Sequence, residues 1–505
     1  MNAKKTFSSR LAATARKVAR AACALALGAA TLAGCGSAGQ QQAAAKTAKL
    51  DPNNPVTITV WHYYNGAQQA SFDELVSEFN ATEGKEKGIY VEGYSQGSIS
   101  DLEKAVTASA AGEVGSQDLP DVFSSYADTA YSIQQEGKLA DLSQYLTADD
   151  LSAYVDSYLQ EGRLNGDDGL YLFPVAKSTE VMMVNKTDWE AFAEATGTTT
   201  DELATEEGIA RVAKRYYEWT DAQTPDVPND GRAFYGRDSM SNYFVLGLKQ
   251  MGTDVFEVKG GKATVNVPKD QVKRLWDCYY VPYVNGYYSS AGKFRSDDVK
   301  TGEILAYTGS TASSMYFPDQ VVGDDSSRPI DYLVLPAPVM EGGEDVQIQQ
   351  GAGMAVTKSD DAHEYASVEF LKWFTQKENN LRFVADSAYL PVRKDANSIQ
   401  ALDEVIQKDG LQIAPKAHDC LESVLEKGDS QTYYASETFP EGYAARKVLD
   451  TDLKDKAVAD RKAVQEAIAG GASHDDAVAP YVSDAAFDAW YDEFTAALDS
   501  AANPS

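Results

Sequence analysis

The chain has 505 residues, with 76 Asp and Glu against 45 Lys and Arg, a net charge of −31 and 43% hydrophobic residues. At about 150 residues per domain, this length predicts two or three domains with a large buried core. The acidic excess argues against nucleic acid as a partner, because a grip on phosphates needs clustered Lys and Arg. The only long apolar run lies at the very start of the chain, which excludes a protein with several membrane spans.

Residues 1–34 have the features of a secretory signal peptide. Lys and Arg without acids precede the apolar stretch 21–33, which is too short to cross a hydrocarbon core of about 30 Å. The stretch leads into Leu32-Ala33-Gly34-Cys35, which resembles a bacterial lipobox. We therefore predict that residues 1–34 are removed and that lipid on Cys35 anchors the protein to the outer face of the cell membrane. The alternative is an ordinary cleavage site near Cys35, without lipid.

The segment 35–54 is rich in Gly, Ala, Gln and Lys and has no apolar periodicity, so we predict a flexible tether. Two cysteines, Cys278 and Cys420, lie in the part that follows. Thiols tend to pair in an oxidising compartment, which predicts a disulfide between these two. The alternative is two separate buried thiols that act as small hydrophobes. The Cys and His residues lack the spacing of a zinc site, so we predict neither a metal nor a cofactor.

Strand and helix patterns alternate from the start of the folded part. A β-rich run, Val56–Trp61, precedes apolar residues at helical spacing from Phe72 to Phe79, and Ser71 with Glu74 forms an expected capping box. Short strands are expected at 89–91 and 121–123, on either side of a helix at 101–110. Such alternation predicts βαβ units and a mostly parallel sheet.

The alternation continues through the rest of the chain. An extended stretch at 170–175 precedes a strand at 181–184, and Thr187 with Glu190 forms an expected capping box for the next helix. The other expected elements are a helix around 272–279, strands at 304–307 and 332–335, a helix at 360–374, and a last helix with Phe487, Trp490, Tyr491 and Phe494 on one face. We interpret the aromatic stripes as core packing.

Four stretches resemble, in the expected order, segments of one protein family. They are Leu119–Phe123, Phe173–Glu180 running into Val184-Asn185-Lys186, Tyr332–Pro338, and Gln350–Val356 before the helix that ends at Phe374. Val184 stands where the family usually has an aromatic residue. Together with the lipobox, and over roughly residues 55–400, these stretches make the chain similar to the extracellular solute-binding proteins of ATP-binding-cassette importers. That family includes maltose-binding protein and many sugar receptors.

The resemblance implies an α/β fold of two lobes, the type II-like periplasmic-binding-protein fold. Each lobe is then a mostly parallel sheet flanked by helices, and three crossings of the chain form a hinge. Lobe 1 is expected at 55–174 plus 338–375, and lobe 2 at 175–337 plus 376–505. In open α/β sheets, ligands bind beyond the carboxyl ends of the strands, and clefts between domains are favoured sites. Candidate ligand contacts are therefore expected at strand ends.

The strand-end loops contain aromatic, amide, hydroxyl and charged side chains that suit a sugar. Aromatic rings stack on the apolar faces of a sugar ring, and polar groups match its hydroxyls. The candidate ligand-binding residues are Tyr63, Tyr64, Asn65, Gln96, Tyr126, Asp128, Lys177, Ser178, Thr179, Glu180, Arg237, Asp238, Ser310, Gln350 and Gly351. For the aromatic residues the alternative is core packing beside a turn. For Lys177 and Glu180 it is a structural ion pair that secures the hinge.

The resemblance implies a binding protein and not an enzyme. We predict that the chain, as a monomer, captures a mono- or oligosaccharide in the cleft and delivers it to the membrane-embedded permease of an ATP-binding-cassette importer. One alternative is a surface glycoside hydrolase or lyase that uses paired carboxylates. Another is a receptor for a non-sugar solute such as a peptide or a polyamine. The sequence lacks a recognisable catalytic signature, which favours binding.

Overall fold

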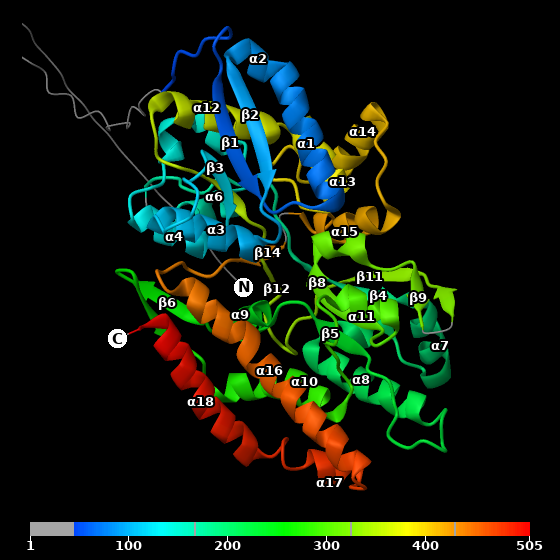
Figure 1. Cartoon of the computed structure of the whole chain (residues 1–505). Helices are drawn as coiled ribbons and strands as arrows, with labels where there is room; N and C mark the ends of the chain where they lie inside the picture. Colours follow the sequence, from blue (N-terminus) through cyan, green and yellow to red (C-terminus); the bar gives the residue numbers. More distant parts are fainter. Residues whose placement is uncertain (1–44, 166–167, 324–325, 429–430, 505) are drawn as a thin grey trace, which may run out of the picture. The chain divides into compact units, whose positions relative to one another are not determined.

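The computed structural model describes residues 45–165, 168–323, 326–428 and 431–504 (Figure 1). The predicted signal peptide, the lipid on Cys35 and the first half of the predicted tether lie outside the described residues. Within the described part, no helix is both long and apolar enough to cross a lipid bilayer. Two four-stranded sheets, each packed against helices, form the framework of this part.

The first sheet has the strand order β13-β3-β1-β2. β1 (Val56–His62) runs parallel to β2 (Ile89–Ser95) and β3 (Val122–Ser125), while β13 (Gly353–Val356) is antiparallel to β3. The helices α1 (Gly66–Ala81), α3 (Ile99–Ala111) and α12 (Asp361–Phe374) pack against it. Ile58 and Val60 pack with α1, and Trp61 packs with α3, because alternate residues of a strand face opposite sides of the sheet. The strands and helices predicted here are confirmed.

The second sheet has the order β11-β4-β8-β5 and is mixed. β4 (Glu180–Asn185) is antiparallel to both β11 (Tyr332–Pro336) and β8 (Ala306–Ser310), whereas β5 (Tyr235–Arg237) is parallel to β8. The expectation of a mostly parallel sheet is therefore wrong for this one. The reason is the direction of β4, which runs away from the stretch that links the sheets, while β8 and β11 run back toward it.

Two predicted helix starts differ from the structure. α1 begins at Gly66, so the predicted capping box at Ser71 lies inside the helix. α7 (Lys186–Thr196) also begins earlier, because the side chain of Asn185 caps it by accepting a hydrogen bond from the Asp188 backbone N–H at 3.2 Å. The stretch 170–175, predicted to be extended, forms one bridge, between Phe173 and Met354.

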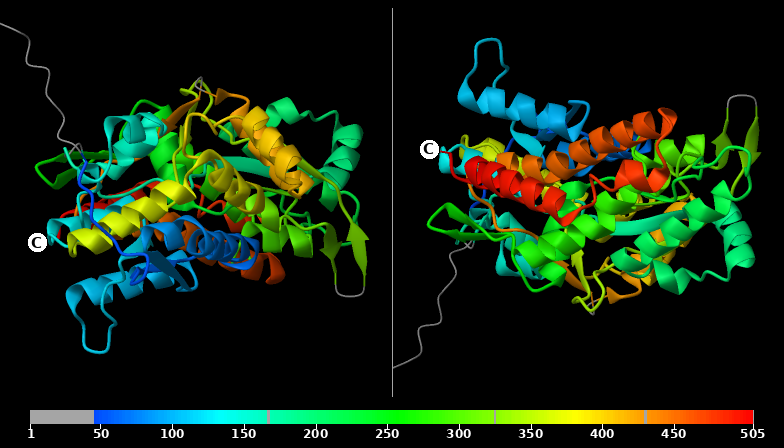
Figure 2. Two further views of the ribbon diagram at one scale, coloured as in Figure 1. Left: turned by 90° about the horizontal axis from the view of Figure 1, so that it is seen from above. Right: turned by 90° about the horizontal axis from the view of Figure 1, so that it is seen from below.

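The helices that pack around the second sheet come from two parts of the chain. The first group is α7, α8 (Glu206–Asp221), α9 (Met240–Gln250), α10 (Lys269–Asn285) and α11 (Arg295–Thr301). The second group is α16 (Gly442–Ala469), α17 (His474–Val478) and α18 (Asp484–Ala502). α16 and α18 lie side by side and also contact α10 (Figures 1 and 2).

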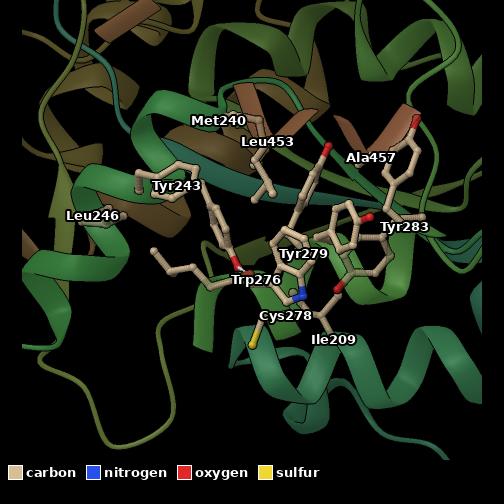
Figure 3. Close-up of a cluster of buried hydrophobic side chains, with 14 of the residues drawn as sticks. Ile209, Met240, Tyr243, Leu246, Trp276, Cys278, Tyr279, Tyr283, Leu453 and Ala457 are labelled. Carbon is tan, nitrogen blue, oxygen red and sulfur yellow. Dashed lines mark hydrogen bonds between the residues drawn. The ribbon is translucent and has the colours of Figure 1, made fainter. Parts of the chain in front are cut away.

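The predicted aromatic stripes form the core between these helices. Trp276 of α10 packs against Phe487 and Trp490 of α18, with ring centroids 5.6 and 4.9 Å apart. Figure 3 shows part of the same core, in which Trp276, Tyr279 and Tyr283 of α10 lie near Leu453 and Ala457 of α16. Their interpretation as core packing is confirmed.

Three stretches that link the sheets lie side by side. Lys177 forms a bridge with Leu390, and Ser178 forms one with Gln350. A further short pair, β12 (Val346–Ile348) with β14 (Thr432–Tyr434), lies beside them. This arrangement matches the three crossings that the resemblance implied.

The lobe boundaries stay a prediction, and two segments pack differently from it. Val346 and Ile348, assigned to lobe 1, contact the core of the second sheet. Phe383, assigned to lobe 2, contacts the core of the first sheet. The remaining α-helices and strands are α2 (Glu83–Lys87), α4 (Ala127–Gln135), α5 (Ala148–Ser152), α6 (Asp156–Gly162), β6 (Phe256–Lys259), β7 (Lys262–Val265), β9 (Gln320–Val322), β10 (Ser327–Pro329), α13 (Lys377–Ser387), α14 (Ile399–Asp409) and α15 (Pro415–Leu425).

The predicted disulfide between Cys278 and Cys420 is wrong, because both thiols are free and buried. β4 explains why they cannot meet. Its residues Met182 and Val184 face the cluster that holds Cys278, whereas Val181 and Met183 face the cluster that holds Cys420. The second sheet thus lies between the two thiols, and the alternative of separate buried cysteines holds.

Candidate functional site

Four tyrosines gather where the elements of the two sheets meet. We call Tyr63, Tyr126, Tyr316 and Tyr389 the tyrosine cluster. Tyr63 follows β1, Tyr126 lies between β3 and α4, Tyr316 ends the 3-10 helix Thr311–Tyr316 that follows β8, and Tyr389 follows α13. The Tyr63 and Tyr389 hydroxyls are 3.0 Å apart, and both phenols interact electrostatically with Tyr126. Two of the four rings come from loops at the carboxyl ends of strands in the first sheet.

The rings of this cluster differ in how much surface they expose. Tyr126 is 41% exposed and Tyr316 is 52% exposed, whereas Tyr389 is 7% exposed. The Tyr126 hydroxyl has no hydrogen-bond partner among the described residues. Protein surrounds the Tyr126 ring on its other sides, and this burial, with the nearby Glu103 carboxylate, raises its pKa to about 12. At neutral pH the phenol is therefore uncharged and able both to donate and to accept.

A hydrogen bond joins the two sides of the cluster. The Tyr316 hydroxyl donates to Asn65 Oδ1 at 3.2 Å. Asn65 precedes α1 of the first sheet, and Tyr316 follows β8 of the second. A molecule that contacts both residues would contact both sides.

Acidic groups and one arginine surround Tyr126. Burial raises the pKa of Asp128, in the first turn of α4, to about 6, although Arg446 acts in the opposite direction. Burial also raises the pKa of Glu103 to about 7, while its hydrogen bond from Thr129 Oγ1 at 3.0 Å lowers it. Arg446 of α16 donates to Asn242 Oδ1 at 3.3 Å and forms no ion pair with a described carboxylate. Donors and acceptors thus remain available beside an exposed ring.

Side-chain amides connect this region to the linking stretches. Asn242, in the first turn of α9, donates through Nδ2 to Glu180 Oε1 at 3.0 Å and to Gln350 Oε1 at 2.8 Å. Gln350 Nε2 donates in turn to the Thr179 carbonyl at 3.2 Å. Gln350, predicted as a ligand contact, therefore uses both ends of its side-chain amide on protein groups, Asn242 and the Thr179 carbonyl.

The predicted charged residues of the hinge are paired inside the protein. Lys177 Nζ donates to Glu161 Oε2 and to the Gly351 carbonyl, both at 2.6 Å. Glu180 Oε2 lies 2.8 Å from Arg237 Nη2, and Arg237 also pairs with Glu206. Arg237 is 4% exposed and Glu180 is 3% exposed. The alternative of structural ion pairs therefore holds for Lys177 and Glu180, but with other partners than each other.

Gly351 allows the linking stretches to approach closely. Its φ is +98°, and a Cβ at this position would lie 2.9 Å from the Ala176 carbonyl oxygen. Ser178 and Thr179 are buried beside it, and the Ser178 N–H donates to the Gln350 carbonyl at 2.8 Å. Gly351 was predicted as a ligand contact, but the stretch Ala176–Ser178 of the same chain occupies the space beside it.

Four other predicted residues are not members of the tyrosine cluster, although the Tyr64 ring borders it, with its centroid 5.3 Å from that of Tyr63. Tyr64 is 2% exposed and packs in the first core against His62, Phe72 and Phe383. Gln96 lines a separate pocket of about 730 Å³ with Tyr94 and Trp61. Asp238 accepts a hydrogen bond from the Arg295 N–H at 2.9 Å, and its burial raises its pKa to about 6. Ser310 caps the 3-10 helix by accepting from the Ala312 N–H at 3.3 Å.

Sequence reasoning missed Tyr316, Tyr389, Asn242, Arg446 and Glu103. None of them directly follows a predicted strand, and the chain has 29 tyrosines, so composition singles out neither Tyr316 nor Tyr389. The Ser239 that caps α9 was a usable signal for Asn242, because a capped helix start after a strand often faces a ligand. Arg446 lies on α16, for which the resemblance implied no ligand contact.

One group of described side chains has the spacing of a metal site. His418, Asp419 and Glu422 of α15 offer one atom each within 4.8 Å of one another. His418 Nε2 is 2.8 Å from Asp403 Oδ1, so an internal hydrogen bond already uses one ring nitrogen. This group lies on α15 and not among the tyrosines.

The family model described as bacterial extracellular solute-binding protein matches residues 74–415. A search of curated proteins found no match. Solved structures do match. The cyclic alpha-maltosyl-1,6-maltose binding protein from Arthrobacter globiformis is 21% identical over 90% of this chain and 100% of its own, with a TM-score of 0.59.

Two further solved structures bind different solutes. The galacto-N-biose-/lacto-N-biose I-binding protein from Bifidobacterium longum, in complex with lacto-N-biose, is 14% identical, with a TM-score of 0.58 over 81% of this chain and 93% of its own. UgpB from Mycobacterium tuberculosis, in complex with glycerophosphocholine, is 18% identical, with a TM-score of 0.60 over 88% and 99%. At these identities the likeness establishes the fold and leaves the ligand open.

Proposed function

Because the chain belongs to the bacterial extracellular solute-binding proteins, we propose that it captures a carbohydrate at the tyrosine cluster. It then delivers the carbohydrate, chemically unchanged, to the permease of an ATP-binding-cassette importer. The observation that carries the proposal is the pair of exposed rings, Tyr126 and Tyr316, in a set of four tyrosines beside free polar groups. Sugar receptors among the similar structures support it.

The chemistry of the cluster suits a sugar. The face of Tyr126 offers an apolar surface for the C–H side of a sugar ring. Asp128 can accept hydrogen bonds from hydroxyls, and Arg446 can donate to them. A sugar hydroxyl both donates and accepts, so it can bridge such a pair where a purely anionic or purely apolar ligand cannot.

Capture couples to closure through Asn65 and Tyr316. A ligand that contacts groups on both sides of the cluster binds the closed arrangement better than an open one, and therefore favours closure. A ligand that binds only the folded form also stabilises it, by about 2.7 kcal/mol at a concentration of 100 Kd.

In this proposal, the N-terminal segment determines where the protein is located in the cell. Residues 1–34 are removed, Cys35 receives lipid, and the binding part works as a monomer at the outer face of the membrane. Replacing Cys35 by Ala is expected to release the protein into the medium or to leave the signal peptide uncleaved. Mass spectrometry of the mature N-terminus checks this, and an unmodified terminus at another residue would contradict it.

A second candidate ligand is a choline-like cation. Aromatic faces with nearby carboxylates, here Tyr126 with Asp128 and Glu103, also bind quaternary ammonium groups. The likeness to a structure with bound glycerophosphocholine favours this candidate over other non-sugar solutes.

A ligand panel distinguishes the candidates. Thermal unfolding is measured with mono- and oligosaccharides, with glycerophosphocholine, with spermidine and with tripeptides. A melting point raised by several degrees with a sugar, which chromatography then recovers uncleaved, supports the proposal. A rise with glycerophosphocholine alone favours the second candidate, and recovery of cleaved sugar would establish a hydrolase instead.

A further inference from the structure

The group with the spacing of a metal site consists of three side chains on one face of α15: His418, Asp419 and Glu422. Glu422 lies about one helical turn after the other two, and residues one turn apart are neighbours on a helix surface. The helix itself therefore brings one imidazole and two carboxylates together. Divalent transition metals accept both ligand types. We call these residues the α15 triad.

Asp403 of α14 orients the imidazole of the α15 triad. Its Oδ1 lies 2.8 Å from His418 Nε2. Because a carboxylate can only accept this hydrogen bond, the proton of the neutral ring is on Nε2, and the lone pair is on Nδ1. Nδ1 lies 4.0 Å from Asp419 Oδ1. Two ligand atoms with metal bonds of about 2.1 Å can be up to about 4.2 Å apart, so one ion can bind both atoms.

A neighbouring strand holds the second ligand. The Tyr332 hydroxyl of β11 donates to Asp419 Oδ2 at 2.7 Å, so the other oxygen, Oδ1, is the one nearer His418. α15 contacts both α14 and β11 (Figure 1). Metal ligands in proteins usually have such outer partners, which fix the orientation of each ligand. Two of the three side chains of the α15 triad are thus oriented by groups outside α15.

Negative charge gathers at the α15 triad without a cation to balance it. Asp403, Asp419 and Glu422 form no ion pair with Lys or Arg in the part of the chain that the structure describes. The Glu422 carboxylate accepts no hydrogen bond there either. By contrast, Lys416 on the same helix pairs with Asp319 at 2.9 Å. Since like charges repel, a bound cation would relieve the repulsion between the three carboxylates.

We propose that the α15 triad binds one divalent transition-metal ion such as Zn²⁺, through His418 Nδ1 and the carboxylates of Asp419 and Glu422. The nitrogen ligand favours such an ion over Ca²⁺ and Mg²⁺, which take oxygen ligands. Through Asp403 and Tyr332 the ion links α15 to α14 and β11, and it stabilises the folded chain because it binds only to that form. The site uses no residue of the tyrosine cluster and is independent of carbohydrate capture.

Titration calorimetry with ZnCl₂ tests the site in the full chain, after EDTA has removed bound metal. Wild type is expected to bind one Zn²⁺ at least ~10-fold more tightly than Ca²⁺, and Zn²⁺ should raise its melting point. Glu422→Gln should weaken Zn²⁺ binding at least ~10-fold and leave the melting point without metal unchanged, because Glu422 has no partner among the described residues. Asp403→Asn should weaken binding about 10- to 100-fold, because His418 loses its orienting partner.

His363→Ala is the matched control. This half-exposed imidazole on α12 also lies beside a carboxylate, with Nδ1 3.0 Å from Asp360 Oδ2, and its loss should leave the Zn²⁺ affinity within about 2-fold. Zn²⁺ affinity unchanged in Glu422→Gln and Asp403→Asn would overturn the site, because other carboxylates would then bind the ion. Equal affinities for Zn²⁺ and Ca²⁺ would overturn it too, because His418 would not be a ligand. If wild type shows no saturable Zn²⁺ binding, the site fails and carbohydrate capture stands. A ligand panel without a sugar that binds would leave the metal site standing.

Discussion

The hinge and the tyrosine cluster use similar side chains in opposite ways. At the hinge, Arg237 is 4% exposed and pairs with Glu180 and Glu206, and Lys177 pairs with Glu161. At the cluster, Arg446 has no carboxylate in ion-pair range among the described residues, and Tyr126 keeps 41% of its surface exposed. The comparison teaches that residue type alone does not identify a ligand contact. A charged group with an ion-pair partner inside the protein serves stability, and one without such a partner is available to a ligand.

The largest expected effect is at the hinge. Arg237→Met should reduce the free energy of unfolding by about 3–5 kcal/mol, because it leaves Glu180 and Glu206 buried without a cation. The matched control is Arg211→Met, at a side chain 61% exposed that pairs with Glu341, where about 0–1 kcal/mol is expected. Urea unfolding measures both. Equal losses in the two variants would show that the buried pairs are not what stabilises the hinge.

Gly351 tests the close approach of the linking stretches. Gly351→Ala combines a positive φ with a Cβ 2.9 Å from the Ala176 oxygen, and should cost about 2–4 kcal/mol. Gly342→Ala has a φ of +73° and no atom within 4 Å of the Cβ, and should cost about 1 kcal/mol. The difference between the two losses of stability measures the cost of the contact with the Ala176 oxygen. Similar melting points for both variants would refute the role assigned to the close approach.

Glu103 tests the cluster through pH. Its folded-state pKa, about 7, lies above the ordinary value of 4.5 because it is buried. The folded form therefore holds the proton more tightly, and stability falls as pH rises from about 4.5 to 7. Glu103→Gln should reduce this pH-dependent loss in the free energy of unfolding by up to about 3 kcal/mol. Urea unfolding at pH 5 and pH 8 measures it, with the exposed Glu113→Gln as control. An unchanged fall in Glu103→Gln would mean that this carboxyl is solvated.

Much of the fold could be predicted from the sequence because its signals are local. The run Val56–Trp61, the periodicity of Phe72 to Phe79 and the stripe from Phe487 to Phe494 each report which face of an element is buried, and burial decides the element. Strand direction was not predictable in the second sheet. β4 is buried along its whole length, as the strands of parallel sheets usually are, so its composition does not reveal its direction. Its antiparallel direction depends on its place directly after the stretch that links the two sheets.

The candidate site could be predicted only in part. Tyr63, Asn65, Tyr126 and Asp128 follow strands of the first sheet, and the rule that ligands bind at carboxyl ends of strands finds them. Tyr316 and Arg446 come from helices hundreds of residues away, and their position depends on tertiary packing. The same rule also selected Tyr64, whose side chain is buried in the core of the first sheet.

Calorimetry of Tyr126→Ala tests carbohydrate capture at the tyrosine cluster most directly. The sugar with the largest thermal shift in the panel is titrated into wild type, Tyr126→Ala, Tyr126→Phe and the control Tyr90→Ala. Tyr126→Ala should weaken binding about 10- to 100-fold, because it removes the stacking face. The melting point without ligand should change little, because the ring is exposed. Unchanged affinity in Tyr126→Ala, or a loss equal to that in Tyr90→Ala, would contradict the proposed site.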